Sequence, residues 1–196
     1  MKLSDRFSEA LVFAEKLHRQ QVRKGSGVPY VAHLLGVASL VLEAGGDEDE
    51  AIAALLHDAI EDQGGWETRT LICEKFGERV ATIVEGCSDS FDGEKKKPWR
   101  EREEAYLQHL QTASASVHLV AMADKLYNAQ SILRDYQRIG EALWPRFKGE
   151  KEGTLWYYNS LLKIFDLSHP LAQELQQTLQ TLETLIQTQS TVNHRN

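Results

Sequence analysis

The sequence predicts an all-α protein, and three observations lead to that fold class. Apolar residues recur at intervals of three and four along most of the 196-residue chain, which is the spacing of a buried helix face. Alternating apolar and polar runs, which are typical of half-buried strands, are few. Only four prolines interrupt the chain. The length and the 42% hydrophobic content suit one sizeable core, so we expect a single helical domain over 1–189 and a frayed tail over 190–196.

Glycines and prolines divide the first half of the chain into helical segments. Ser4 is a suitable N-cap for the first helix, and a loop over 21–30 with two glycines and a proline ends it. Gly77 is expected to be a hinge between two short helices. The helices expected here cover 3–20, 30–44, 47–62 and, on the two sides of Gly77, 66–89.

A polar loop, 90–98, opens the second half and is expected to be its most mobile segment. Four further helices are expected over 99–111, 116–139, 153–165 and 171–188, and the second of these is long and apolar enough to be a central buried helix. The last one carries a stripe that can either pack inside the chain or form the seam of a homodimer. The stripe consists of Leu175, Leu179, Leu182 and Ile186.

Composition and charge exclude several classes of protein. A formal net charge of -7 argues against general nucleic-acid binding, because a phosphate backbone is held by many Lys and Arg contacts. No apolar run reaches the ~18 residues that a bilayer span needs, and no leader-like segment is present, so we expect a cytoplasmic protein. Cys73 and Cys87 stand apart without a second cysteine at metal-ligand spacing, which favours reduced thiols.

The segment "AALLHDAIED" (53–62) places four polar groups at the end of an apolar run. On a helix, residues four apart share a face, so His57 is expected beside Glu61 and Asp58 beside Asp62. Buried carboxylates are rare unless they are paired or bind a metal. A His-Asp pair alone can equally be structural, and Glu61 and Asp62 alone can be solvated at a helix end.

Two other positions supply the missing ligands of a metal site. His33 lies in the apolar segment "PYVAHLLGVA", and Asp124 interrupts "HLVAMADKLYNA". Taken singly, His33 can be a hydrogen-bonded core histidine, and Asp124 can pair with Lys125. Together with His57 and Asp58 they form two imidazoles and two carboxylates, which suits Mn²⁺, Fe²⁺, Zn²⁺ or Co²⁺ better than Mg²⁺.

Three segments in this order resemble one known family. "RKGSGVPYVAH", "AALLHDAIED" and "ADKLYN" are similar to the HD-superfamily hydrolase domain of RelA/SpoT-type proteins, which removes the 3′-pyrophosphate of the alarmone (p)ppGpp, and the length resembles that of the small stand-alone alarmone hydrolases. The resemblance implies an HD-type helical bundle and a divalent cofactor, with Mn²⁺ favoured. It places the metal ligands at His33, His57, Asp58 and Asp124 and the water-activating pair at Glu61 and Asp62.

The resemblance also implies a nucleotide substrate and some of its contacts. Arg23 and Lys24 match the Arg-Lys pair that holds the nucleotide in the family, and Asn128 and Ser131 match positions that face ribose and phosphates. The chain departs from the family pattern at Leu34, where the family often has Pro, at Tyr127 in place of His, and at Gln130 in place of Arg. None of these departures removes a ligand or the acid pair.

Further substrate contacts are expected from local charge and from aromatic residues. The stretch 90–102 concentrates cations, from which Lys97 and Arg100 are assigned to the substrate, and Tyr157 is a candidate for stacking on the base. A solvated Lys95–Lys97 run and a core role for Tyr157 are the alternatives. Two other functions stay open: an HD hydrolase acting on another phosphorylated nucleotide, such as an adenosine 3′-pyrophosphate nucleotide, NADPH or a 5′-nucleotide, and a non-catalytic HD sensor or adaptor.

Overall fold

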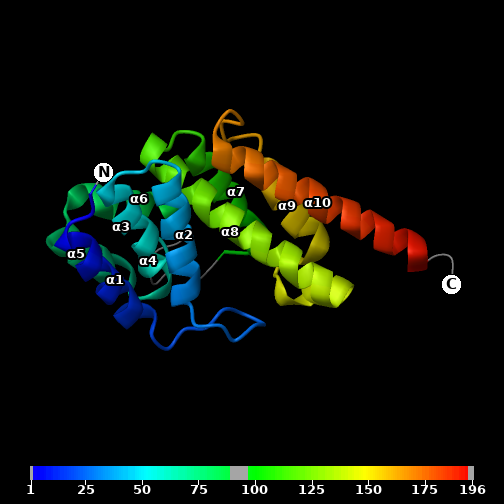
Figure 1. Cartoon of the computed structure of the whole chain (residues 1–196), viewed down its shortest axis with the longest axis horizontal. Helices are drawn as coiled ribbons and strands as arrows, with labels where there is room; N and C mark the ends of the chain where they lie inside the picture. Colours follow the sequence, from blue (N-terminus) through cyan, green and yellow to red (C-terminus); the bar gives the residue numbers. More distant parts are fainter. Residues whose placement is uncertain (1, 89–96, 194–196) are drawn as a thin grey trace. The chain divides into compact units, whose positions relative to one another are not determined.

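The computed structural model describes residues 2–88 and 97–193, and it confirms the all-α fold class (Figure 1). Within these residues the only extended pairing is an isolated antiparallel bridge between Val22 and Pro29. The segment expected to be mobile, 90–98, lies outside the described residues except for its last two positions. The same is true of residues 194–196 in the expected tail, whereas the helix before them continues to Asn193.

Contacts divide the chain into two compact units, Met1–Asp124 and Lys125–Asn196. Each is treated by itself, and the expectation of a single domain over 1–189 stays a prediction. No helix in the described part of the chain combines the length and apolar character needed to span a bilayer. In the first unit the helices are α1 (Asp5–His18), α2 (Val31–Glu43), α3 (Glu48–Leu56), α4 (Ala59–Asp62), α5 (Gly65–Phe76), α6 (Glu78–Cys87), α7 (Trp99–Leu110) and the beginning of α8 (Ala115–Ile139).

Helix α3 is the centre of the first unit. It packs against α1, α2 and α6, and the whole run from Ala51 to Leu56 is buried (Figure 1). Alanines in this run let the neighbouring helices approach closely, and burial of its aliphatic side chains supplies about 1.5–3 kcal/mol each for the larger ones. A capping box starts the helix, because Asp47 accepts from the backbone N–H of Glu50 and Glu50 accepts from that of Asp47. The position of α3 is therefore fixed by packing on three sides and by its own cap.

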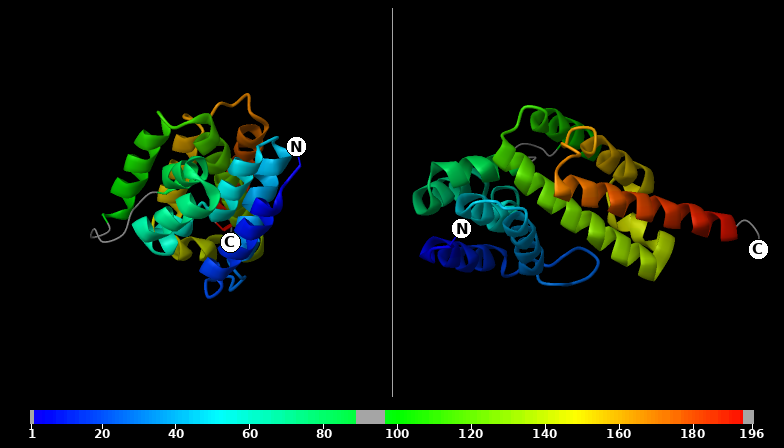
Figure 2. Two further views of the ribbon diagram at one scale, coloured as in Figure 1. Left: turned by 90° about the vertical axis from the view of Figure 1, so that its left-hand side faces the viewer. Right: turned by 45° about the horizontal axis from the view of Figure 1, so that its top comes forward.

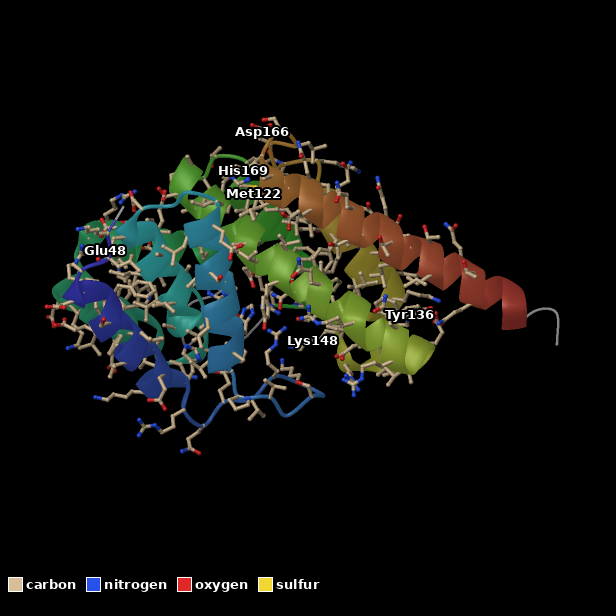
Figure 3. All side chains as sticks on the ribbon, viewed as in Figure 1. Glu48, Met122, Tyr136, Lys148, Asp166 and His169 are labelled. Atoms are coloured by element: carbon tan, nitrogen blue, oxygen red, sulfur yellow. The ribbon has the colours of Figure 1, made fainter. Side chains whose placement is uncertain are left out.

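The ends of the neighbouring helices are fixed by equally local features. Ser4 caps α1 as expected, and its side chain accepts from the backbone N–H of Arg6. Glu48, at the start of α3, accepts hydrogen bonds from the backbone of Ser4 and from the Arg6 guanidinium, which joins the two helix starts (Figure 3). Gly77 (φ 91°) ends α5 and begins α6, which confirms the expected hinge.

One expected helix is not continuous. The sequence predicts a single helix over 47–62, but α3 ends at Leu56 and the short α4 begins at Ala59. His57 and Asp58 form the turn between the two helices, and Asp58 has a ψ of -1° in place of the usual helical value. No glycine or proline marks this break, so the apolar spacing alone could not reveal it.

The second unit consists of the rest of α8, a 3₁₀ helix (Gly140–Arg146), α9 (Glu150–Leu161) and α10 (Pro170–Asn193). Within this unit α10 runs alongside the second half of α8, and Asn159 of α9 donates a hydrogen bond to Glu183 of α10 (Figure 2). The apolar stripe of α10 is buried in the chain itself, from 0% exposure at Leu175 to 9% at Ile186. The stripe therefore packs inside the chain and does not form a dimer seam. The homodimer itself stays a prediction.

Candidate metal centre and active site

Four of the predicted residues come together in the first unit. His33 lies on α2, His57 and Asp58 form the turn between α3 and α4, and Asp124 lies on α8. The side chains of His33, His57 and Asp124 are 1%, 2% and 9% exposed, whereas that of Asp58 is 22% exposed. Three of the four groups are thus withdrawn from water, and Asp58 is the member that faces solvent.

Both imidazoles lie close to one oxygen of Asp58 and to one oxygen of Asp124. Nε2 of His57 lies 3.0 Å from Oδ2 of Asp58 and 3.6 Å from Oδ1 of Asp124, while Nε2 of His33 lies 3.5 Å and 3.2 Å from the same two oxygens. The two Nε2 atoms are 3.2 Å apart. Atoms that each bind one ion at about 2.1 Å lie about 3.0–3.4 Å from one another, so the cluster fits a divalent metal. His33, His57 and Asp58 also stand out as a candidate metal-binding group by the mutual distances of their ligand atoms.

The break after α3 gives His57 its orientation. Its Nδ1–H donates to the carbonyl oxygen of Ala54 at 2.8 Å, in the last turn of the helix. That bond keeps the proton on Nδ1 and leaves the lone pair of Nε2 directed at the cluster, as a metal-binding imidazole requires. The packed helix α3 thus positions the histidine, and the turn that follows turns Asp58 toward the same point.

The electrostatics of the cluster favour a cation. Burial lowers the pKa of the His57 imidazole, but the charges and hydrogen bonds of Asp58 and Asp124 outweigh it and raise this pKa well above its ordinary value. Burial likewise raises the pKa of Asp58, and the His57 charge together with hydrogen bonds from both imidazoles brings it well below the ordinary value. The buried Asp124 and the partly buried Asp58 are therefore stabilised by positive charge, which a proton or a divalent ion can supply.

The predicted water-activating pair lies one helical turn beyond Asp58. The backbone N–H of Asp62 donates to the carbonyl of Asp58 at 2.9 Å, so Glu61 and Asp62 follow the turn directly on the short helix α4. Oδ2 of Asp62 accepts a hydrogen bond of 2.7 Å from Nε2 of Gln21. The guanidinium of Arg102, which is only 11% exposed, lies 4.0 Å from the Glu61 carboxylate. Each acid is thus adjacent to a polar group that is not a metal ligand.

The loop between α1 and α2 carries the predicted Arg-Lys pair (Figure 2). The backbone N–H of Arg23 donates to Val28 at 2.8 Å, and its guanidinium lies over the ring of Tyr30 at 5.9 Å. Lys24 is exposed on the same loop. Tyr30 in turn donates from its hydroxyl to Oδ2 of Asp58 at 2.6 Å. The loop that carries the predicted nucleotide contacts therefore reaches the metal cluster through Tyr30.

The predicted substrate cations Lys97 and Arg100 lie at the protein surface. Lys97 and Arg100 are exposed, and Nε of Arg100 donates to Glu104 at 2.7 Å along α7, in an i,i+4 pair at the helix surface. Lys95 and Lys96 lie outside the described residues. Arg102, in the same stretch, lies beside a predicted acid, Glu61.

Three predicted substrate residues belong to the second unit. Asn128 is on α8, one helical turn beyond Asp124. The hydroxyl of Ser131 donates to the carbonyl of Tyr127 at 2.9 Å and accepts from Arg134 at 3.0 Å. Tyr157 is buried at 8% exposure, with the Lys125 ammonium 5.7 Å from its ring centroid. The substrate roles of these residues stay predictions.

Sequence reasoning missed several polar residues around the cluster. The sequence does not single out Tyr30, Gln21 or His18, which is 2% exposed and stacks on Tyr30 with 5.3 Å between the ring centroids. The only signal for Tyr30 was its position between Pro29 and the helix of His33. Loop residues give no periodic pattern, so their contacts could be found only in three dimensions.

Comparison with known proteins supplies the family. The sequence profile of the HD domain matches residues 10–154, well over half of the chain. The chain belongs to the HD-domain family. This agrees with the resemblance found in the sequence, and it places all four cluster residues inside the matched range.

Several curated relatives are named as pyrophosphohydrolases. The guanosine-3′,5′-bis(diphosphate) 3′-pyrophosphohydrolase MESH1 of Xenopus tropicalis is 40% identical over 142 residues, which cover 69% of this chain and 72% of the relative. The human protein of the same name is 37% identical over 146 residues, with 71% and 74% covered. A guanosine-3′,5′-bis(diphosphate) 3′-pyrophosphohydrolase of Aquifex aeolicus is 46% identical over 83 residues, which are 42% of this chain but only 12% of that protein.

Solved structures confirm the HD-type fold. A metazoan orthologue of SpoT, described as hydrolysing ppGpp, superposes with a TM-score of 0.75 at 28% identity and covers 92% of this chain and 97% of its own. A crystal structure of a protein from Listeria monocytogenes EGD-e superposes with a TM-score of 0.65 at 26% identity, with 79% and 99% covered. This HD protein therefore resembles a small stand-alone hydrolase along most of its length.

Proposed function

We propose that this protein is a metal-dependent hydrolase that removes the 3′-pyrophosphate of (p)ppGpp and yields GDP or GTP plus pyrophosphate. The observation that carries the proposal is the similarity, over about 70% of the chain, to relatives named for this reaction. A complete His-His-Asp-Asp cluster beside two further acids supports an active enzyme over a binding module, because a module that only binds a ligand has no need of a water-activating pair.

In this proposal His33, His57, Asp58 and Asp124 hold a divalent ion, with Mn²⁺ first and Fe²⁺, Co²⁺ or Zn²⁺ as the other candidates. Such an ion, when bound, lowers the pKa of water toward neutrality and offsets negative charge on phosphoryl oxygens. The nearly buried His33, His57 and Asp124 would hold this ion from the interior, and the more exposed Asp58 would hold it from the side nearer to solvent. The cytoplasmic location and the absence of nucleic-acid binding belong to the same proposal.

The two acids of α4 supply the proton transfer. Hydrolysis forms a bond between the oxygen of water and the phosphorus next to the ribose, and it breaks the bond from that phosphorus to the 3′ oxygen. Glu61 and Asp62 accept the proton of the attacking water, and the 3′ oxygen leaves as a hydroxyl after it gains a proton. Because both acids lie within one turn of Asp58, they can reach a water held at the cluster.

Positive side chains hold the polyphosphate and the nucleoside. Arg23 and Lys24 are assigned to the nucleotide because their loop ends at Tyr30, whose hydroxyl contacts Asp58. The partly buried Arg102 lies next to Glu61, where a guanidinium can also meet a phosphoryl oxygen. Asn128, Ser131 and Tyr157, together with Lys97 and Arg100, complete the proposed set of contacts.

A panel of nucleotides tests the proposal. Metal-depleted protein is reloaded with Mn²⁺ and incubated with ppGpp, pppGpp, an adenosine 3′-pyrophosphate nucleotide, NADPH and 5′-nucleotides, and the products are separated by anion-exchange chromatography. We expect pyrophosphate and GDP or GTP from the first two. Release of monophosphate only, or the absence of turnover on the whole panel, would overturn the proposal.

Matched variants show whether any activity belongs to the cluster. Asp124→Asn removes one charged ligand and should abolish turnover. Asp166→Asn makes the same change at an exposed aspartate whose carboxylate binds Ser168, and it should keep the rate of the wild type (Figure 3). Equal rates in the two variants would show that the turnover arises elsewhere.

A further inference from the structure

Two side chains at the base of the loop 19–30 donate hydrogen bonds to two carboxylates at α4. The hydroxyl of Tyr30 donates to Oδ2 of Asp58 at 2.6 Å, and Nε2 of Gln21 donates to Oδ2 of Asp62 at 2.7 Å. The donors are themselves joined, because the backbone N–H of Tyr30 donates to the carbonyl of Gln21 at 3.0 Å. One short piece of chain thus holds both a predicted metal ligand and a predicted proton acceptor.

Tyr30 contacts the oxygen of Asp58 that faces the two imidazoles. Oδ2 of Asp58 is the oxygen that lies 3.0 Å from Nε2 of His57 and 3.5 Å from that of His33. The phenol is the donor in this bond, because an ionised carboxylate can only accept. The ring is held in place by stacking on His18 at 5.3 Å and by an edge contact to His33 at 5.4 Å. The direction of the hydroxyl, and hence of the Asp58 carboxylate, is fixed.

The orientation of the Gln21 amide is fixed by two other donors. Its Oε1 accepts from Nε2 of Gln63 at 2.8 Å and from Nδ1 of His18 at 2.7 Å. An amide NH₂ cannot accept a hydrogen bond, so the oxygen of Gln21 must face Gln63 and its NH₂ must face Asp62. His18, buried at 2% exposure, therefore supports both donors: its ring stacks on Tyr30 and its Nδ1 binds Gln21.

We propose that Tyr30 and Gln21 are positioning residues that form a clamp on α4, in which Tyr30 sets metal affinity through Asp58 and Gln21 sets the rate of hydrolysis through Asp62. The Tyr30 half needs only that the cluster binds a divalent ion. The Gln21 half rests on the proposed function, because it acts on a carboxylate that is proposed to accept the proton of water. Outer hydrogen bonds of this kind orient metal ligands and tune their strength.

Metal binding tests the Tyr30 half without any assay of activity. The dissociation constant for Mn²⁺ is measured by equilibrium titration, with the free ion followed by electron paramagnetic resonance. Tyr30→Phe removes one hydroxyl and should raise this constant about 10- to 100-fold. Tyr136→Phe is the matched control, since it removes a buried tyrosine hydroxyl that binds a carboxylate, Glu141, at 2.8 Å in the second unit (Figure 3). A constant for Tyr30→Phe within twofold of that for Tyr136→Phe would overturn this half.

Steady-state kinetics at saturating Mn²⁺ test the Gln21 half. Gln21→Ala should lower kcat about tenfold or more, as expected when a hydrogen bond to a charged group is lost, with little change in KM or in the Mn²⁺ dissociation constant. Gln20→Ala, at the exposed neighbouring position, should keep the kcat of the wild type. Equal kcat values for the two variants would overturn the assignment.

A double-mutant cycle separates positioning from a loss of structure. If Gln21 acts through Asp62, adding Gln21→Ala to Asp62→Ala should change kcat less than twofold, whereas independent structural damage would multiply the two losses. Multiplying losses would therefore overturn the Gln21 half. Should the wild type hydrolyse nothing on the nucleotide panel, the proposed function fails and the Gln21 half falls with it, while the Mn²⁺ titrations still decide the Tyr30 half.

Discussion

Removing the metal should destabilise the protein by an amount that depends on His57. Each imidazole Nε2 lies 3.0–3.6 Å from the other Nε2 and from one oxygen each of Asp58 and Asp124, but these residues come from α2, the turn after α3 and α8, so unfolding separates them. An ion that binds only the folded form stabilises it by about 2.7 kcal/mol at a hundredfold excess over its dissociation constant. For a chain of this size that corresponds to a rise in Tm of about 5–11 °C.

The assay is a pair of thermal melts for each variant, one with Mn²⁺ and one with a chelator. Wild type should show the full difference in Tm, and His57→Ala should show about 1 °C or less. Because each variant is compared with itself, the cost of deleting a buried ring cancels. His109→Ala is the control: this histidine lies in the same unit and binds the carbonyl of Gly86 at 3.1 Å, so its metal-dependent shift should stay that of the wild type. If the Tm difference between Mn²⁺ and chelator were as large in His57→Ala as in the wild type, the metal centre would be refuted.

Three further predictions address the acids, the loop and the packing of the first unit. Glu61→Gln and Asp62→Asn should each lower kcat about 10²- to 10⁴-fold at unchanged metal content, and their double variant should lose less than the product; full activity in both would exclude them as bases. Lys24→Ala should lower kcat/KM about tenfold or more without changing metal content, and unchanged kinetics would remove the loop from the substrate site. Gly86→Ala should cost about 1–3 kcal/mol in urea unfolding, because its new Cβ would lie 2.6 Å from a methyl of Val117, and Val117→Ala should recover part of that loss.

The sequence predicted the helices better than it predicted the contacts between them. Apolar spacing, the Ser4 cap and Gly77 are local signals, and each marks a helix boundary in the structure. The break at His57 and Asp58 carries no such signal, since the apolar run continues through it and neither glycine nor proline occurs there. Helix propensity therefore overestimated the length of the segment, and packing around α3 decided where it ends.

The candidate site, too, could be predicted from the sequence only in part. His57 and Asp58 could be proposed from one segment, but Asp124 lies 66 positions beyond Asp58, and it was joined to them by its polar character in an apolar segment and by the resemblance to a known family. Charge clustering pointed to the stretch around Arg100, yet the residue beside Glu61 is Arg102, because a helix turns neighbouring side chains to different faces. Contacts of this kind follow from the fold and cannot be read from composition.

The four cluster residues differ in how much of each side chain is exposed to solvent. Both imidazoles and Asp124 are nearly buried in the described part of the first unit, whereas Asp58 keeps a larger exposed surface. Glu61 and Asp62 come one helical turn after Asp58, on the short helix α4. The turn between α3 and α4 thus joins the most exposed member of the cluster to the two acids, so a change in this turn would alter both together.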